Sequence, residues 1–469
     1  MPRSEPPSDD IQTQNTPETV TEIIPEALDF FAPTVINDSY EDRIFDRINP
    51  TSGYSGKTGG ILKFFSPPTD WFQDFSDSYV WLKLKLVGKD QSNKTTKLSD
   101  LKDSKLTVAN IIPHSIFSQI RVKIGNTVIT YSDADYAYKA YFPILLNGSQ
   151  IAHQNYFQPH AGFIKDTAGE FDTLVDNNVD NSKNKGALLR RKELFSADGE
   201  GEFLIRPHTG MCFTDLYLLP YISSEFEFMR NENPNFYLIH DGDSSSTFKI
   251  EITDAAFYIR KYKFKVPVVA GLERALAAGR LLKYNITETC INTFTIPMGT
   301  TYYQNNSLFN SLIATRIIIG MVDAEAYTGK NVLNPFNFQH FQRTHIRLMK
   351  NGVEWPEGEQ ITNFSTGVPP SYIMAHYFFL SSINCVYNRD VPPISFKEYA
   401  NGYFLTSYNM SADGVSAMNP YSAAYKPANI RLEIKFGTQL GRAVQVIVMT
   451  ENINQMTIDY KRNVTIQQQ

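Results

Sequence analysis

The sequence predicts an all-β protein built from two tandem antiparallel β-sandwich domains with a few short helices. Its 469 residues suit two domains of roughly 200 residues each better than one. The chain is rich in Tyr and Phe, with 26 and 32 residues, and also holds 26 Gly and 25 Pro. This mixture is typical of strands separated by turns. A third observation, the alternation of apolar and charged residues along several segments, locates individual strands.

The first 28 residues differ in composition from the rest of the chain. They hold six acidic residues, five prolines and many Ser, Thr and Gln, with little apolar material before Ile23. Such a segment cannot bury enough apolar surface to fold by itself. We expect residues 1–28 to form a disordered acidic arm that orders on a partner.

Five segments have the apolar pattern of strands. Residues 79–87, 430–436 and 456–461 alternate apolar with polar side chains, which indicates strands with one buried face. Residues 314–322 and 443–450 are apolar on both sides. This second pattern favours central positions in a sandwich or at an interface.

Residues 248–266 read as one long strand whose buried face changes side. Phe248 and Ile252 share one phase, whereas Phe257 and Ile259 make the opposite face apolar. Either both faces are covered here, or a β-bulge shifts the phase. The pattern is compatible with both.

A helix is predicted after this strand. Leu272, Ala275 and Leu276 recur at helical spacing in an Ala-rich stretch. We interpret it as a linker between the sandwiches. The predicted organisation is the arm at 1–28, a first sandwich at 29–267, a helical linker at 268–284, a second sandwich at 285–464 and a tail at 465–469.

An internal repeat indicates that one sandwich was duplicated. Residues 118–129, SQIRVKIGNTVI, match residues 344–355, THIRLMKNGVEW, at an offset of 226. Both matches read as hairpins around a Gly/Asn turn. Further along, YAYKAYF at 136–142 resembles YIMAHYF at 372–378 at an offset of 236. Two collinear matches over this distance predict duplication of a whole domain.

Two long polar stretches interrupt the strands, at about 165–200 and 408–428. Insertions of this size in a compact sandwich are usually functional surface loops. We expect them to form towers or interface arms.

The sequence contains no catalytic or metal-binding motif with the spacing and flanking residues that its chemistry requires. Gly56-Lys57-Thr58 lacks the first Gly of a phosphate-binding loop, since Thr51 occupies that position. The Ser–His–Asp set near His240 is adjacent in sequence, which does not indicate a triad. It reads as a hydrophilic turn, and a Ca²⁺ site at Asp241 lacks the twelve-residue loop. We expect no catalytic, cofactor-binding or metal-binding residues, and no enzyme.

The thiols and imidazoles are also spaced too widely for zinc or disulfides. The three cysteines are Cys212, Cys290 and Cys385, and no Cys-x-x-Cys pair occurs. We expect buried free thiols in a reducing compartment. The eight histidines contain no His-x-x-x-His pair, so a helical zinc site is not expected. They are His114, His153, His160, His208, His240, His340, His345 and His376.

Two basic clusters stand out against a formal net charge of −5. Arg190-Arg191-Lys192 is interpreted as a solvated loop. Arg260 and the lysines at 261, 263 and 265 alternate with aromatic residues along a strand, which favours a solvated strand face over an interface, a docking site for the acidic arm or a nucleic-acid surface. The acidic balance predicts no sequence-specific nucleic-acid binding.

Several of these segments resemble one family of viral structural proteins. The resemblance rests on SQIRVKIGNTVIT (118–130) with its Tyr-rich neighbour, on DAAFYIRKYKFK (254–265) with the Ala-rich helix after it, and on the stretches at 429–436 and 446–464. The chain is similar in these places to the major capsid proteins of the Polinton/Maverick (adintovirus-like) lineage. The match is scattered over most of residues 30–464, and the 165–200 insertion and the arm have no counterpart.

This resemblance implies a double jelly roll, two tandem eight-stranded antiparallel jelly-roll sandwiches. It also implies a homotrimer that forms a pseudo-hexagonal capsomer and tiles an icosahedral shell. The implied partners are neighbouring capsomers and a single jelly-roll penton or minor capsid protein. For the trimer contacts we expect aromatic-rich segments, namely 408–428, 136–142 and 372–378.

The chain begins without an apolar signal sequence and has no run of 18 apolar residues, so neither secretion nor membrane insertion is expected. The expected location is the virion, assembled inside the host cell. An alternative is a carbohydrate-binding or glycan-processing β-sandwich, which requires exposed aromatic platforms and, if hydrolytic, paired carboxylates.

Overall fold

The computed structural model places the residues from Tyr40 onward in one compact unit. The described residues are 37–51, 60–89, 95–96, 105–131, 134–147, 152–174, 183–241, 247–309, 314–356, 358–364, 371–383, 385, 392–410 and 429–468. The predicted arm at 1–28 lies outside them, as do 411–428 of the second polar stretch.

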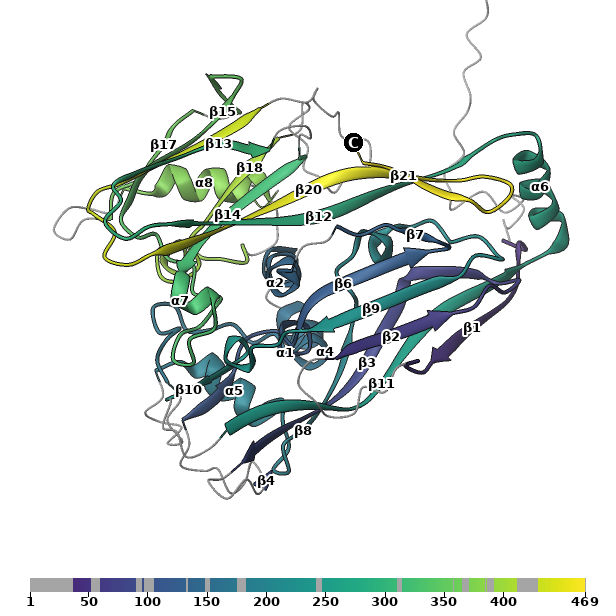
Figure 1. The fold of residues 1–469 in the computed structure, drawn as a ribbon, viewed down its shortest axis with the longest axis horizontal. Helices are drawn as coiled ribbons and strands as arrows, with labels where there is room; N and C mark the ends of the chain where they lie inside the picture. The colour runs from purple at the N-terminus through teal and green to yellow at the C-terminus, as the bar shows by residue number, and fades with distance from the viewer. Residues whose placement is uncertain are drawn as a thin grey trace, which may run out of the picture. The chain divides into compact units, whose positions relative to one another are not determined.

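The first half of this unit forms two facing antiparallel sheets (Figure 1). Sheet A has the strand order β1-β11-β3-β4, with β8 also paired to β3, and sheet B has the order β2-β9-β6-β7. Their bounds are β1 Tyr40–Ile48, β2 Ile61–Ser66, β3 Phe72–Lys89, β4 Thr95–Thr96, β6 Phe117–Ile124, β7 Thr127–Val128, β8 Glu200–Ile205, β9 Ser224–Arg230 and β11 Thr247–Phe264.

The second half repeats this arrangement. Sheet D has the order β12-β20-β14-β18, with β21 paired to β20, and sheet E has the order β13-β19-β15-β16, with β17 paired to β15. Their bounds are β12 Leu282–Ile296, β13 Tyr302–Phe309, β14 Arg316–Asp323, β15 Arg343–Lys350, β16 Val353–Glu354, β17 Gln360–Ile361, β18 Leu405–Asn409, β19 Ile430–Phe436, β20 Val444–Ile458 and β21 Val464–Gln468.

The two halves share one topology, strand for strand. The order β1-β11-β3-β8 corresponds to β12-β20-β14-β18, and β2-β9-β6-β7 corresponds to β13-β19-β15-β16. Each half therefore contributes eight corresponding antiparallel strands in two packed sheets. The all-β double jelly roll expected from the sequence is confirmed, and the shared order is what duplication of one domain predicts. We call sheets A and B the first jelly roll and sheets D and E the second.

Short helices and one small sheet fill the connections. Sheet C pairs β5 (Leu106–Val108) with β10 (Leu238–His240). The described helices are α1 Ile112–Ser115, α2 Tyr136–Asn147, η3 His153–Phe157, α4 Gln158–Ala161, α5 Lys185–Glu193, η5 Gly210–Phe213, η6 Pro234–Phe236, α6 Val266–Ala277, α7 Ala324–Tyr327, α8 Ile373–Ser382 and α9 Phe396–Tyr399.

The predicted linker helix exists as α6, but it is shorter than the range 268–284. It starts at Val266 and ends at Ala277, where Gly279 takes a φ of +83° that L side chains rarely adopt. Residues from Leu282 belong to β12 instead, because Tyr284 and Ile286 are buried and pair with β20. Pairing with a long strand overrides local helix propensity there.

The repeated hairpins form where they were predicted. β6 turns into β7 through Gly125 and Asn126, with a φ of +58° at the glycine. β15 turns into β16 through Asn351 and Gly352, whose φ values of +50° and +87° have the sign of a type I′ hairpin turn.

The phase change in the long strand β11 is caused by bulges. The register with β3 shifts between Ile252 and Asp254 and again between Tyr258 and Arg260. The shifts bring Ile252, Phe257 and Ile259 onto the same buried face. The bulge alternative is therefore the correct one.

Candidate functional site

The feature that organises this molecule is the contact between its two jelly rolls, which is centred on helix α2. This helix follows the β6–β7 hairpin and lies between β6 and the strand β12 of the other jelly roll (Figure 1). Its residues are almost all buried. An amphipathic helix would leave a polar face to water, whereas α2 is covered all round.

Aromatic stacking joins α2 to a loop of the second jelly roll. The rings of Tyr141 and Phe336 stack with centroids 4.2 Å apart, and Phe142 lies 5.2 Å from Phe338. The Tyr138 hydroxyl donates to the Pro335 carbonyl over 3.0 Å. Aromatic pairs stabilise a contact beyond the burial of their apolar area, and they favour defined orientations of the two rings.

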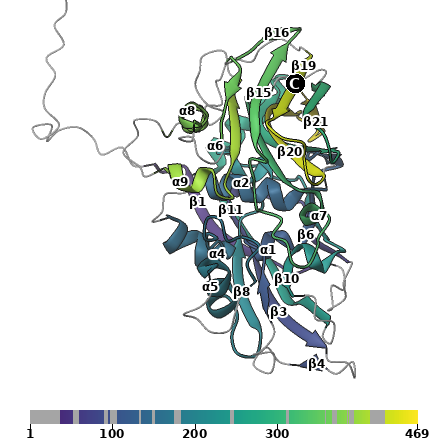
Figure 2. The ribbon, with the colours of Figure 1, turned by 90° about the vertical axis from the view of Figure 1, so that its left-hand side faces the viewer.

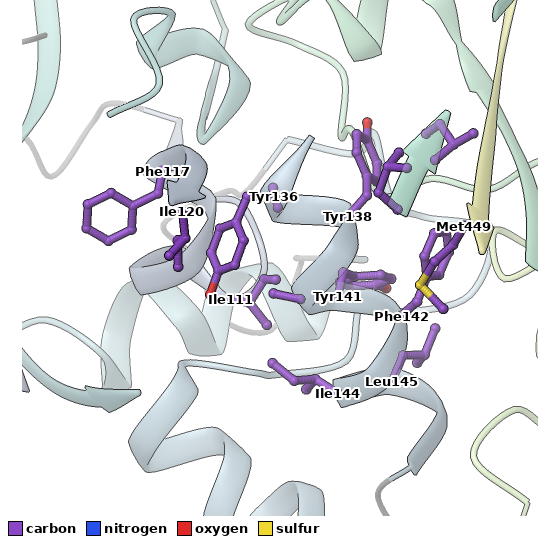
Figure 3. Close-up of a cluster of buried hydrophobic side chains, with 14 of the residues drawn as sticks. Ile111, Phe117, Ile120, Tyr136, Tyr138, Tyr141, Phe142, Ile144, Leu145 and Met449 are labelled. Atoms are coloured by element: carbon purple, nitrogen blue, oxygen red, sulfur yellow. The ribbon is translucent and has the colours of Figure 1, made fainter. Parts of the chain in front are cut away.

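Sheet D provides the surface beneath these rings. Figure 3 shows Met449 of β20 beside Phe142 of α2. Strand β14 is buried at every residue, on both of its faces. The prediction that 314–322 and 443–450 lie centrally or at an interface is thereby confirmed, because one face of these strands belongs to the sandwich core and the other meets the first jelly roll.

A buried ion pair crosses the same contact. Lys139 of α2 donates to Glu288 of β12, and their side chains are 5% and 1% exposed. The second carboxylate oxygen of Glu288 accepts the Gly210 backbone N–H at 2.8 Å. Removing one member of such a pair leaves an uncompensated buried charge, which is strongly destabilising.

The beginning of the 165–200 insertion extends the contact. Asp172 accepts from the Asn334 backbone at 2.8 Å and from the Asn337 side chain at 2.7 Å. Lys165 lies 2.8 Å from Glu398 of α9, and the Tyr403 hydroxyl donates to the Asp166 carbonyl. This part of the insertion is an interface arm within the chain and not a tower.

The interpretation of Arg190-Arg191-Lys192 as a solvated loop is wrong. These residues lie on α5, and Arg190 is fully buried. Its guanidinium donates to Asp166 at 2.7 Å and to the carbonyls of Val108 and Ile164. The ion pair joins two parts of the insertion, and the hydrogen bond to Val108 attaches the insertion to the strand β5. A position that is polar in the sequence is therefore part of the packed interior.

The second basic cluster is divided by the β11 bulges. Lys261 points to the buried side, with 2% of its side chain exposed, and donates to Asp46 at 2.6 Å and Ser66 at 3.2 Å. Arg260 lies over the Phe45 ring on the opposite face and pairs with Asp77. The expectation of one solvated basic face is wrong for Lys261.

Two histidines lie near α2, with His114 buried and His208 partly buried. The rings of His114 and His208 lie 5.3 Å apart, and the Tyr136 hydroxyl is 2.9 Å from His114 Nδ1. Burial lowers the pKa of His114 to about 3. Burial and the charges of His114, Arg206 and Lys139 lower the pKa of His208 as well. Both imidazoles are therefore neutral at physiological pH.

A cavity of about 620 Å³ lies at the border of the two jelly rolls. Its lining includes Lys139, His208, Arg316 and Glu451. Arg316 pairs with Glu451 across sheet D. The cavity therefore lies between Lys139 of the first jelly roll and the Arg316–Glu451 pair of the second.

The remaining sequence candidates do not converge. Gly56-Lys57-Thr58 lies outside the described residues. His240 packs its ring against Phe248, and burial lowers its pKa. Among the described parts of the chain, no three His, Cys, Asp or Glu side chains come close enough together to hold a metal ion. No disulfide joins the three cysteines, of which Cys212 is buried and Cys290 and Cys385 are partly buried.

The three segments predicted to form trimer contacts differ in their exposure. Residues 136–142 are enclosed within the chain as part of α2, so their rings are not available to another copy. Residues 372–378 form part of α8, which exposes Ile373, Met374 and Tyr377. Residues 411–428 lie outside the described part.

Sequence reasoning missed most residues of the interface. Phe336, Phe338 and Asp166 belong to connections without periodicity, so no pattern indicates their burial. Glu288 carried one weak signal, since its phase places a carboxylate on the same face as the buried Tyr284 and Ile286.

Comparison with solved structures finds the same fold over nearly the whole chain. A chain of the Sputnik virophage matches with a TM-score of 0.62 at 10% identity, covering 95% of this chain and 92% of its own. The mavirus major capsid protein matches at 0.53 and 11%, covering 99% and 97%. The Faustovirus major capsid protein matches at 0.54 and 9%, covering 91% and 92%. These likenesses establish the double jelly-roll fold.

Sequence comparison adds one distant relative. An uncharacterized protein of Caenorhabditis elegans, F54H12.2, is 24% identical over 240 residues, which are 51% of this chain. The match spans about half of that protein, 53% of its length. No family model matches the sequence. Within the described residues, no helix has the length and apolarity needed to cross a membrane.

Proposed function

We propose that this protein is a major capsid protein whose trimers form pseudo-hexagonal capsomers of an icosahedral shell. The observation that carries the proposal is the likeness of the whole double jelly roll, over 91–99% of the chain, to proteins that include two viral major capsid proteins. Two equivalent sandwiches already joined side by side are a suitable repeating unit for a ring of six. The role is structural, and the chain is not an enzyme.

The partners follow from this role. A capsomer of three copies meets neighbouring capsomers, and a single jelly-roll penton or minor capsid protein closes the fivefold positions. The protein resides in the virion of a DNA virus or virus-like mobile element of the Polinton/Maverick lineage. Obligate interfaces in such assemblies bury more than roughly 2,000 Å².

The mass of the purified protein tests the proposal. We expect light scattering to give three times 53.3 kDa and negative-stain images to show hexagonal capsomers. A monomer that binds oligosaccharides would overturn the capsid function in favour of a carbohydrate-binding sandwich.

The acidic arm gives a second test. We propose that residues 1–28 dock beneath the shell or against a neighbouring capsomer. Deleting them is expected to preserve the trimer and to reduce the yield of particles. An unchanged particle yield contradicts this role of the arm.

A further inference from the structure

Helices α2 and α8 occupy the same place in the two jelly rolls. Helix α2 lies in the connection between β7 and β8, and α8 lies in the corresponding connection between β17 and β18. The sequence similarity of 136–142 and 372–378 falls within these two helices. Helix α8 therefore carries a surface that corresponds to the one with which α2 docks on the second jelly roll.

The two helices differ in what covers them. Helix α2 is enclosed by the second jelly roll, whereas α8 leaves Ile373 68%, Met374 56% and Tyr377 44% exposed. In both views of the ribbon α8 lies apart from α2 (Figures 1 and 2), and it contacts β17 and β18 of its own jelly roll.

The exposed apolar surface continues beyond α8. Ile361 of β17 is 60% exposed and Phe396 of α9 is 39% exposed, and both elements contact α8. We name Ile361, Ile373, Met374, Tyr377 and Phe396 the α8 patch. Five exposed large apolar side chains on three contacting elements make this region a candidate interaction surface.

The sheet that corresponds to D is less covered on its outer face. Sheet D is buried on both faces at β14, but its counterpart β3 in sheet A alternates, with buried residues at 80, 82, 84 and 86 and partly exposed ones between them. The outward residues include Tyr79 and Trp81, and Tyr258 of β11 pairs with Tyr79. Phe45 of β1, 44% exposed, lies on the same face.

We propose that the α8 patch of one copy docks on the outer face of sheet A of a second copy, as α2 docks on sheet D within one chain. This inference rests on the proposed trimer and names the surfaces that build it. The contact is heterologous, so each copy carries one donor patch and one acceptor sheet. Repetition over three copies closes a ring of six jelly rolls and leaves neither surface free.

A charge on the α8 patch tests the donor surface. Met374→Glu introduces a carboxylate in the first turn of α8, a position that tolerates acidic residues. We expect sedimentation equilibrium to show trimer association weakened on the order of 100-fold or more. The matched control is Met298→Glu, a methionine that is 69% exposed in the turn after β12, and its association is expected to stay within threefold of wild type.

Both surfaces are tested together by cross-linking. One tagged chain carries Tyr377→Cys, and a differently tagged chain carries Trp81→Cys. In mixed trimers a short bismaleimide is expected to join the two tags, while Met298→Cys with Trp81→Cys is expected not to. The parent chain, with its three native cysteines, gives the background.

The outcomes separate the two proposals. A wild-type trimer that Met374→Glu leaves unchanged, with no cross-link between the tags, overturns the docking surfaces and leaves the capsid function standing. A wild-type protein that stays monomeric at all concentrations overturns both. Loss of the trimer by Met374→Glu with an unchanged thermal melt of the monomer supports the inference.

Discussion

Sheets A and D are built from corresponding strands but meet different surroundings. In sheet D, β14 is buried at all eight residues, and an ion pair with α2 is enclosed at the edge strand β12. In sheet A, the outer face carries Trp81, Lys83 and Lys85, which pair with acidic residues of β8. The same topology thus presents one covered face and one half-open face. The difference shows that the polarity of a strand's outward side chains depends on what packs against them and not on the topology of the sheet.

A lysine placed on the outer face of each sheet is expected to give the largest difference in stability between sheets D and A. Met449→Lys buries an unpaired ammonium against Phe142, which costs several kcal/mol, so little soluble protein is expected. Trp81→Lys on sheet A keeps contact with water and with Glu202, and is expected to cost no more than roughly 2 kcal/mol. Soluble yield and urea midpoints measure both. Equal losses would show that the two faces do not differ.

Removing one member of the buried Lys139–Glu288 ion pair is expected to give the second-largest loss of stability. Lys139→Ala leaves Glu288 buried without its partner, which is expected to lower the free energy of unfolding by about 3–5 kcal/mol. The double variant Lys139→Met with Glu288→Gln removes both charges and keeps an acceptor for the Gly210 N–H. It is expected to recover most of the loss in urea denaturation. A double variant as unstable as the single one argues against the ion pair as the cause.

Acid is expected to destabilise the fold through the two histidines near α2. In the folded protein the pKa of His114 is about 3 and that of His208 is also lowered, while unfolded histidines titrate near 6.5. Between pH 6.5 and about 3 the unfolded chain binds more protons, so stability is full above 6.5 and falls as pH decreases. The folding equilibrium is expected to drop about tenfold per pH unit for His114.

Melting curves at several pH values measure this effect. His114→Gln, which cannot titrate, is expected to flatten the pH dependence across that window. A variant whose pH dependence equals that of wild type would assign the acid sensitivity to other groups.

The smallest expected loss of stability comes from the N-cap of α9, the helix that contacts α8. Ser395 caps α9 by accepting from Glu398, which reaches back to the Ser395 N–H at 2.9 Å. Ser395→Ala is expected to lower stability by about 1 kcal/mol, and Ser395→Asp to restore most of it. Thermal denaturation of the monomer distinguishes them. No difference between the two variants would show that the cap is not what holds α9.

The strands were predictable because one face of each is buried by its own sandwich. Alternation at 79–87 and 430–436, and the hairpin turns at Gly125 and Asn351, report contacts that are local or periodic. The β11 phase change was visible, although its cause required the register with β3.

The contact between the jelly rolls was not predictable in the same way. Arg190 reads as a surface residue because its partner Asp166 is 24 residues away in an aperiodic segment. The aromatic residues of 136–142 were singled out, but sequence does not distinguish contact within a chain from contact between chains. The structure shows that the contact is within the chain, because Tyr141 of α2 stacks on Phe336 of the same chain.

The long strand β20 has a consequence for the order in which the chain folds. It pairs with β12 over fifteen residues and then with β21, whose Val464 carbonyl accepts from Thr127 of the first jelly roll, 337 residues earlier. Closing a contact of that sequence separation is slow and late. During synthesis β12 and β14 of sheet D thus lack their shared partner until residues 444–458 have emerged, whereas every strand of sheets A and B lies before residue 265. The unpaired edges of β12 and β14 are open to aggregation in that interval.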